Sequence, residues 1–328
     1  MVDHAIPRRR PGALELHELL ADVELAVQAA TTLEAHIVLD CLSGAEHLAV
    51  AGRPWWVGDL PASARTVRTV VLVSGYDKVN VAHSLTCLLQ AGSPRLVIQT
   101  GVAGGFVSSG IQVGDLALAA SDTYADLGVL APEGWLSADA FAEPVALVDG
   151  VELRNTFPLD PGLVDASARI FRAASWPGGT PRVRVGPFLT SSQVTGTSAR
   201  AELLDARWGG IAESMEGAAA AHVCALYGVP FLELRGISNL VEDRDRASWR
   251  IEEAAEVAAR ATLMVCARID EVLVAFRAAG DEDDAAGDDH DAAREEDDAA
   301  GDGSHAGDAG SDTSGFDAAD SSAGGCFS

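Results

Sequence analysis

Positive charge is scarce in this 328-residue sequence. Its 23 Lys and Arg residues face 49 Asp and Glu residues, which gives a formal net charge of −26. The basic run Arg8–Arg10 is isolated, and acidic residues follow it closely. No basic stripe exists that could displace counterions from a phosphate backbone. The sequence therefore excludes a nucleic acid as the partner.

Long apolar runs and paired cysteines are also missing. No run reaches membrane-spanning length, and the N-terminal region lacks the uninterrupted apolar core of a signal peptide. The five cysteines form no CxxC pair, and four of them stand in apolar, periodic segments. Reduced, packed thiols are typical of such a pattern. We expect a cytoplasmic protein with no membrane partner.

Several motifs that carry chemistry are absent as well. The sequence has no Walker loop, no GxGxxG, no HExxH and no serine elbow. Its Cys and His spacings offer no zinc site. We therefore expect neither a metal nor an organic cofactor.

Acidic residues are unevenly spread along the chain. Residues 280–328 hold sixteen Asp or Glu, a single arginine and two aromatic residues. Such a composition cannot bury enough apolar surface to offset the entropy of ordering, so it predicts a disordered acidic tail. We expect an N-terminal extension over residues 1–22 and one large domain over residues 23–279, which is long enough for a full core.

Within that domain, short β-rich runs alternate with helical segments. The alternation predicts an α/β fold, a three-layer α/β/α sandwich with a central sheet, and the near-continuous apolar runs are typical of strands covered on both faces. The expected strands are residues 23–31, 67–75, 94–101, 113–121, 182–191 and 229–236. The expected helices are residues 79–92, 161–175, 213–228 and roughly 248–279.

In such sheets, ligands bind outside the carboxyl ends of the strands. The polar or glycine-rich residues that follow the expected strands are therefore the candidates. They are Glu34, "TGVAGGF" (100–106), "SSQVTGT" (191–197), Glu216, Arg235 and Asn239.

Each candidate also has a purely structural interpretation. The glycines of "TGVAGGF" let a backbone approach a flat or anionic ligand, but they also suit a tight strand-to-helix turn without a ligand. Glu213 and Glu216 would share one helix face. For Glu213 we expect a solvated helix end, and for Glu216, which precedes an Ala-rich buried helix, a functional carboxylate. Arg235 indicates a carboxylate or phosphate partner, and its purely structural interpretation is an ion pair with Glu216 or a neighbouring carboxylate.

Together these segments resemble the nucleoside phosphorylase and nucleosidase superfamily over residues 23–275. "TGVAGGF" resembles its TGSAGG loop, "SMEGAAAAHVC" its VEMEA helix, "RGISN" its RAISD segment and "AATTLEA" (29–35) its GAMEEEV segment. Residues 124–135, 154–160 and 237–249 are similar to the futalosine hydrolases within that superfamily. The resemblance implies a nucleoside phosphorylase-like fold with a mixed sheet and a homo-oligomer that binds a small nucleoside.

The resemblance also implies residue roles. Glu34 would be the general base that activates water, Glu216 would hold the ribose hydroxyls, and Met215 would pack against the sugar. A carboxylate near the sugar stabilises the ribosyl cation that forms as an N-glycosidic bond breaks. The other substrate-binding residues would be Arg235, Val102, Ala103, Gly104, Gln193 and Val194.

Asn239 stands where adenine-releasing members of the superfamily have aspartate. Its NH₂ group can donate to O6 of a 6-oxopurine, and its carbonyl oxygen can accept from a protonated N7. The resemblance therefore implies hypoxanthine as the leaving group. The expected reaction is the hydrolysis of futalosine to hypoxanthine and dehypoxanthine futalosine, a step toward menaquinone.

Three alternatives stay open: a 6-oxopurine nucleoside phosphorylase, a methylthioadenosine/S-adenosylhomocysteine nucleosidase, and a non-catalytic nucleoside-binding module. Gln99 and Val102 stand where phosphorolytic members have a cation and a hydroxyl, which favours water as the acceptor. Val194 replaces the aromatic residue of the adenine-releasing enzymes. Three arginines are candidates for binding the benzoate end of futalosine: Arg154, Arg244 and Arg246.

Overall fold

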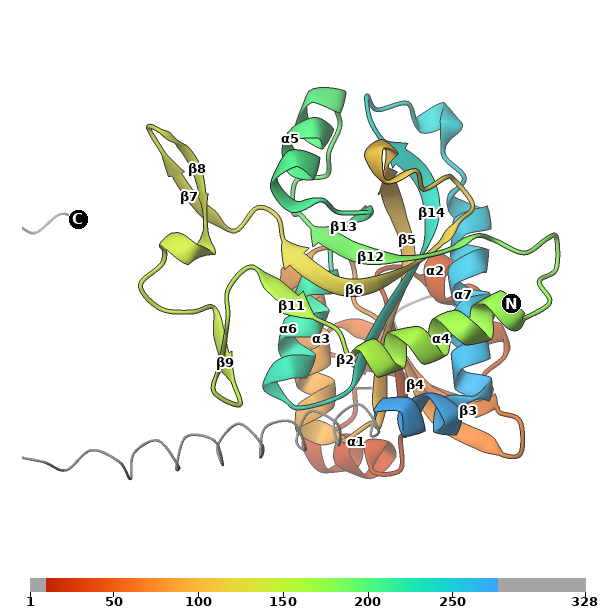
Figure 1. Cartoon of the computed structure of the whole chain (residues 1–328). Coiled ribbons are helices and arrows are strands. Elements are labelled where there is room, and N and C mark those ends of the chain that lie inside the picture. The colour runs from red at the N-terminus through yellow and green to blue at the C-terminus, as the bar shows by residue number, and fades with distance from the viewer. Residues whose placement is uncertain (1–9, 277–328) are drawn as a thin grey trace, which may run out of the picture. The chain divides into compact units, whose positions relative to one another are not determined.

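The computed structural model describes residues 10–276, all of which belong to one compact unit. The strands of its main sheet are β1 (Leu25–Ala29), β2 (Ser43–Val50), β3 (Arg53–Pro61), β4 (Thr66–Val73), β5 (Leu96–Phe106), β6 (Leu116–Tyr124), β11 (Thr156–Pro158), β12 (Val183–Thr190), β13 (Ala212–Ser214) and β14 (Phe231–Val241). In the described residues they form one ten-stranded mixed sheet of order β11-β6-β12-β13-β5-β1-β4-β3-β2 (Figure 1). Strand β14 pairs with both β5 and β6. The predicted α/β class with a central mixed sheet is confirmed.

Helices cover both faces of this sheet (Figure 1). One layer contains α1 (Ala13–Leu20), α3 (Lys78–Ala91) and α6 (Gly217–Leu226). The other contains α2 (Thr32–Asp40), α4 (Pro161–Ala173) and α7 (Ile251–Ala267). Helix α5 (Ser198–Trp208) packs on a small separate cluster formed by the ends of several strands. No helix within residues 10–276 has both the length and the apolar character needed to cross a bilayer.

The chain leaves the main sheet between β6 and β11. There it forms two small hairpins, β7 (Gly128–Ala131) with β8 (Gly134–Ser137), and β9 (Ala146–Val148) with β10 (Val151–Leu153). Both hairpins extend away from the sheet (Figure 1). Short 3₁₀ turns occupy residues 107–109, 138–140 and 246–248.

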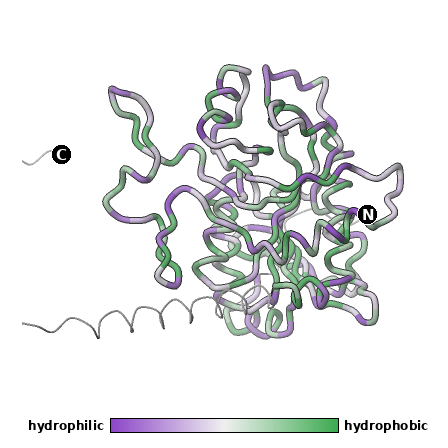
Figure 2. Tube along the Cα trace, in the orientation of Figure 1, coloured by the Kyte–Doolittle hydropathy of each residue, from purple (hydrophilic) through white to green (hydrophobic). Residues whose placement is uncertain are grey.

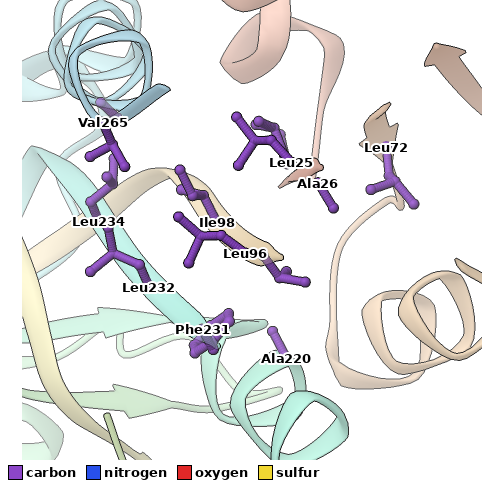
Figure 3. Packing of buried hydrophobic residues seen from close by; sticks show 14 of the residues in the cluster. Leu25, Ala26, Leu72, Leu96, Ile98, Ala220, Phe231, Leu232, Leu234 and Val265 are labelled. Carbon is purple, nitrogen blue, oxygen red and sulfur yellow. The ribbon is translucent and has the colours of Figure 1, made fainter. Parts of the chain in front are cut away.

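The core lies between the sheet and the two helical layers. Every residue of β1 is buried, as expected for a central strand covered on both faces. Figure 3 shows Val265 of α7 beside Leu234 of β14, and Ala220 of α6 beside Phe231 at the start of the same strand. Figure 2 shows hydrophobic residues along the strands of the sheet and within the helices that cover it. Burial on both faces therefore accounts for the near-continuous apolar runs of the central strands.

All six predicted strands and all four predicted helices have a counterpart in the structure, although several boundaries are wrong; the strand predicted over residues 229–236, for example, runs to Val241. "TGVAGGF" does not follow its strand; it continues β5 to Phe106, because β13 and β14 pair with it there. The helix predicted from residue 213 begins at Gly217, because residues 212–214 form β13. The predicted N-terminal extension contains α1, and its residues 1–9 lie outside the described residues, as does the predicted acidic tail, residues 280–328.

The carboxyl ends of the parallel strands place the candidate residues along one edge of the sheet. Strands β14, β5, β1 and β4 are mutually parallel neighbours, in that order. Strand β3 is antiparallel to β4, so the first residue of β3 lies at this same edge. The residues that follow or end these strands therefore form a row in the order β14, β5, β1, β4 and β3.

Candidate active site

Glu34 is fixed at the start of α2 by a capping box. Thr31 is the N-cap, and its Oγ1 accepts from the Glu34 N–H at 3.3 Å, while Glu34 Oε2 accepts from Thr31 N at 2.9 Å and from Thr31 Oγ1 at 2.8 Å. The second carboxylate oxygen, Oε1, accepts from the Val102 N–H of β5 at 3.0 Å. Glu34 is only 5% exposed. The "TTLE" sequence thus both starts the helix and aims a buried carboxylate at β5.

Glu216 lies at the junction of β13 and α6, where it is the N-cap residue of α6. Its Oε1 accepts from the Asp77 N–H at 3.1 Å and its Oε2 from the Met215 N–H at 3.3 Å. Arg235 Nη2 lies 3.6 Å from Oε2. Burial raises the pKa of Glu216, and Arg235 and the Asp77 N–H partly offset that rise. The structure confirms the predicted ion pair between Glu216 and Arg235.

Arg235 is fully buried in the middle of β14 and does not end the strand. Its Nε donates to Glu233 Oε1 at 2.9 Å. Burial alone would lower the pKa of Arg235, but the charges of Glu233, Glu216 and Glu34 together raise it. The guanidinium therefore stays charged and links the carboxylates of three different elements.

Gly101 allows Glu34 and Arg235 to approach each other. Its φ of +149° is unfavourable for residues with a side chain. A Cβ atom on Gly101 would collide with Glu34 Oε1 and would lie 2.9 Å from Arg235 Nη1. Of the two interpretations left open for these glycines, the strand-to-helix turn is wrong, because residues 100–106 continue β5, and the group that approaches Gly101 is the carboxylate of Glu34.

Asn239 lies on β14 opposite Gly104 of β5, beside an irregularity in the strand pairing. A Cβ atom on Gly104 would lie 3.2 Å from Asn239 Nδ2, so the amide occupies the space above this glycine. Asn239 Oδ1 accepts from Ser238 Oγ at 2.8 Å, and Nδ2 donates to Leu240 O at 2.9 Å. These bonds fix the direction of the half-buried amide, and each end keeps capacity for one further hydrogen bond.

The remaining predicted binding residues lie around this centre. Asp77 connects the loop after β12 to the site, because its Oδ1 accepts from Ser192 Oγ at 2.6 Å while its N–H donates to Glu216. Gln193 and Val194, in that loop, are exposed, and the carbonyl of Gln193 accepts from Ser191 Oγ at 3.0 Å. The half-buried or buried residues of the set are Val102, Ala103, Gly104 and Met215.

The expectation of a solvated Glu213 is wrong. Glu213 is 6% exposed and points from β13 to Thr195, accepting from its N–H at 3.0 Å and its Oγ1 at 2.6 Å. Burial raises the pKa of Glu213, and the two hydrogen bonds from Thr195 oppose the rise. The carboxylate ties the loop after β12 to β13 because a strand, not a helix end, carries it.

A second buried carboxylate pair escaped the sequence analysis. Asp122 on β6 accepts from Thr190 Oγ1 at 3.0 Å, but its Oδ2 and Glu233 Oε2 have no hydrogen-bond donor among the described residues. A Cβ atom on Gly217 would overlap both of these oxygens, so they lie close together. Burial raises the pKa of Asp122 well above its usual range, and the neighbouring Glu233 raises it further. A proton kept on Asp122 Oδ2 would donate to Glu233 Oε2 and so satisfy both atoms. The signal in the sequence was a glutamate within the apolar run "FLEL".

Outside this cluster, a hollow of about 480 Å³ lies between α2 and α7. It is lined by Thr32, Leu33, His36, Glu252, Glu253 and Glu256. None of the predicted site residues contributes to it. The candidate site is therefore defined by the converging side chains at the sheet edge.

Residues 24–274 match the family model of the phosphorylase superfamily. The chain is 42% identical over 160 residues to the futalosine hydrolase of Streptomyces coelicolor, which covers 48% of this chain and 60% of that protein, less than two thirds of its length. It is 36% identical over 195 residues to the futalosine hydrolase of Thermus thermophilus, and the match covers 58% of this chain and 78% of that protein. It is 30% identical over 239 residues to a 5'-methylthioadenosine/S-adenosylhomocysteine nucleosidase of Geobacillus kaustophilus, and the match covers 73% of this chain and 92% of that protein.

Solved structures agree on the fold. A 5'-methylthioadenosine/S-adenosylhomocysteine nucleosidase from Neisseria meningitidis, in complex with methylthio-immucillin-A, superposes with a TM-score of 0.64 at 22% identity. The match covers 75% of this chain and 99% of that one. The family model spans most of the described sheet and both helical layers, and so this chain belongs to the phosphorylase superfamily.

Proposed function

We propose that this protein hydrolyses the N-glycosidic bond of futalosine, giving hypoxanthine and dehypoxanthine futalosine, as a step toward menaquinone. Two relatives at 42% and 36% identity carry the name futalosine hydrolase, which supports this substrate. The observation that carries the hydrolytic chemistry is Glu34, a carboxylate 5% exposed and held by three hydrogen bonds beside β5. No metal or organic cofactor takes part in the proposal.

In the proposed reaction, Glu34 removes a proton from a water molecule that attacks the anomeric carbon of the ribose. The bond between that carbon and the purine breaks, its electrons move onto the base, and N7 takes up a proton from the solvent. A ribosyl cation develops on the way, and the nearby carboxylates favour it electrostatically. Glu216 would accept hydrogen bonds from the ribose hydroxyls and so fix the sugar beside Glu34. A positioned base contributes roughly 10²–10⁴-fold to such a step.

Asn239 would select the leaving base. Its Nδ2 keeps one N–H for O6 of hypoxanthine, and its Oδ1 keeps one lone pair for the protonated N7. A 6-amino group is itself a donor, so it would face the Asn239 N–H, and neither of these two donors would have an acceptor. This argues against the adenine-releasing alternative, which the 30% identical nucleosidase relative otherwise supports.

The charges around the site favour water over phosphate as the acceptor. Four buried carboxyl groups, Glu34, Asp122, Glu216 and Glu233, accompany the single buried cation Arg235 in this cluster, and even with Asp122 protonated the remaining three carboxylates outnumber that cation. A phosphate ion entering beside them would meet net negative charge. Gln99, at the position where phosphorolytic enzymes have a cation, is completely buried.

One experiment separates the candidate functions. The protein is incubated with futalosine, inosine and methylthioadenosine, each with and without phosphate, and the released base is identified by chromatography. Hypoxanthine released from futalosine without phosphate supports the proposal. A requirement for phosphate would make the protein a phosphorylase, adenine as the main product would make it a methylthioadenosine-type nucleosidase, and binding without turnover would make it a binding module.

We also propose a homo-oligomer that acts in the cytoplasm. The two hairpins between β6 and β11 carry exposed apolar side chains, which a second copy of the chain would cover. These side chains include Leu130 at 85%, Leu136 at 48%, Leu147 at 62% and Val151 at 59% exposure. Sedimentation analysis tests this, and a monomer at micromolar concentration would contradict it.

A further inference from the structure

The row of side chains along the sheet edge suggests how a long nucleoside would lie. This step rests on the proposed function. The purine would contact Asn239 on β14, and the ribose would lie between Glu34, after β1, and Glu216, which the loop after β4 holds through Asp77. A substituent on the 5′ side of the ribose would then extend away from the purine. In the row of strands, the next position in that direction is β3.

The first residue of β3 is Arg53. Its guanidinium lies over Gly75, because a Cβ atom on this glycine would be 2.7 Å from Arg53 Nη1. The Gly75 N–H donates to Ala30 O at 3.0 Å, next to the turn that leads into Glu34. Arg53 Nη2 donates to Asn80 Oδ1 at 2.6 Å, in the first turn of α3. The guanidinium thus packs against the loop that follows β4 and is held there by its hydrogen bond to Asn80.

The charge of Arg53 is not balanced by a neighbour. Among residues 10–276 it forms no ion pair with a carboxylate, although the side chain is half-buried. Lys78, in the same region, is paired with Asp126 at 2.6 Å. A planar guanidinium without a carboxylate partner suits a planar carboxylate ligand.

The three arginines singled out by the sequence are less well placed. Arg154 donates to the carbonyls of residues 138 and 141 and pairs with Glu152 at 3.0 Å. The guanidinium carbons of Arg244 and Arg246 lie 4.7 Å and 5.8 Å from the ring centre of Trp249. Both belong to the segment that follows β14, at the purine end of the row.

We propose that Arg53 binds the carboxylate of an aromatic acid carried on the 5′ side of the nucleoside. Strands β1 and β3 are two strand spacings apart, which corresponds to about 10 Å and leaves room for a ring between ribose and carboxylate. Tyr76, between Gly75 and Asp77, is 62% exposed and offers an aromatic face to such a ring. Arg53 would therefore determine specificity for the acid without touching the reacting bond.

The test compares three substrates: futalosine, its methyl ester, in which the carboxylate is neutralised, and inosine, which lacks the substituent. In Arg53→Gln, the KM for futalosine is expected to rise about tenfold, as for the loss of one charge-assisted hydrogen bond. Its kcat should not change, and neither should the kinetics of the ester and of inosine. Arg53→Lys should recover part of the preference for the acid.

Asn80→Ala is the matched control, because it removes the hydrogen-bond partner of Arg53 and leaves the cation in place. It should keep the preference of the wild type for the acid over the ester. If Arg53→Gln slows inosine as much as futalosine, or keeps the preference for the acid, Arg53 only shapes the loop and the inference is wrong. Failure of the wild-type protein to hydrolyse futalosine would instead reject the proposed function, and the inference with it.

Discussion

Glu34 and Arg235 meet at Gly101, a position where no side chain can be accommodated. Glu34 comes from α2 and Arg235 from the middle of β14, so two segments two hundred residues apart contact the same glycine of β5. The absent Cβ atom therefore determines how closely the proposed base approaches the buried cation.

Gly101→Ala should separate this pair. The new Cβ atom would collide with Glu34 Oε1, and the φ of +149° adds backbone strain. Because a displacement of about 1 Å can cost on the order of 100-fold, kcat for futalosine should fall by about that factor. Gly110→Ala is the control, since Gly110 also has a positive φ, +69°, but no atom lies within 4 Å of its added Cβ. Equal losses in the two variants would contradict the argument.

Glu34→Gln should strongly reduce turnover and spare the fold. Glutamine can serve at the third position of a capping box, so α2 should keep its start. Without a base for the water, kcat should fall about 10²–10⁴-fold, while futalosine binding measured by calorimetry should change little. Glu15→Gln, at the third position of α1, is the matched control, because the Glu15 carboxylate likewise accepts from the N–H of its N-cap residue, Gly12, at 3.3 Å, and it should keep full activity. Retained turnover in Glu34→Gln would exclude Glu34 as the base.

Asn239→Asp should change the preferred base. The carboxylate repels O6 and accepts from a 6-amino group, so the ratio of kcat/KM for the 6-amino analogue to that for futalosine should rise about tenfold or more. Ser238→Ala is a useful companion, because it removes the hydroxyl that fixes the amide and keeps the amide itself. It should lower activity on both substrates without changing their ratio. An unchanged ratio in Asn239→Asp would mean that this amide does not contact the base.

Most of the residues that the sequence identified lie near the carboxyl ends of buried strands, although Arg235 lies in the middle of β14 and residues 100–106 continue β5. Glu34, Glu216 and Asn239 could be found because a polar side chain next to a buried apolar segment is unfavourable unless it has a partner or a function. The structure brings all three to one edge of the sheet. The course of β5 through "TGVAGGF" could not be predicted, because it depends on pairing with β13 and β14, which lie more than a hundred residues away. Sequence spacing alone favoured a turn at these glycines.

Buried carboxylates were harder to interpret from the sequence. Glu213 precedes a helix in the sequence, yet it lies on a short strand and faces Thr195, a contact that only the folded chain creates. Glu233 interrupts an apolar run, and its partner Asp122 lies 111 positions earlier in the chain. A lone acid in a strand indicates that a partner exists, but it does not say which residue that partner is.

The Asp122–Glu233 pair makes stability depend on pH in a direction opposite to that of most carboxylates. Burial first, and then Glu233, raise the pKa of Asp122 in the folded protein well above its value in the unfolded chain. Between these two pKa values the folded state binds more protons, so the free energy of unfolding decreases as pH rises through that window. Asp122→Asn cannot ionise, and its amide can donate to Glu233 Oε2. Urea unfolding at pH 5 and pH 8 should therefore show a smaller decrease for Asp122→Asn than for the wild type. Asp165→Asn, on the exposed side of α4, should follow the wild type. If the free energy of unfolding decreased equally between pH 5 and pH 8 for Asp122→Asn and for the wild type, this pair would hold no extra proton.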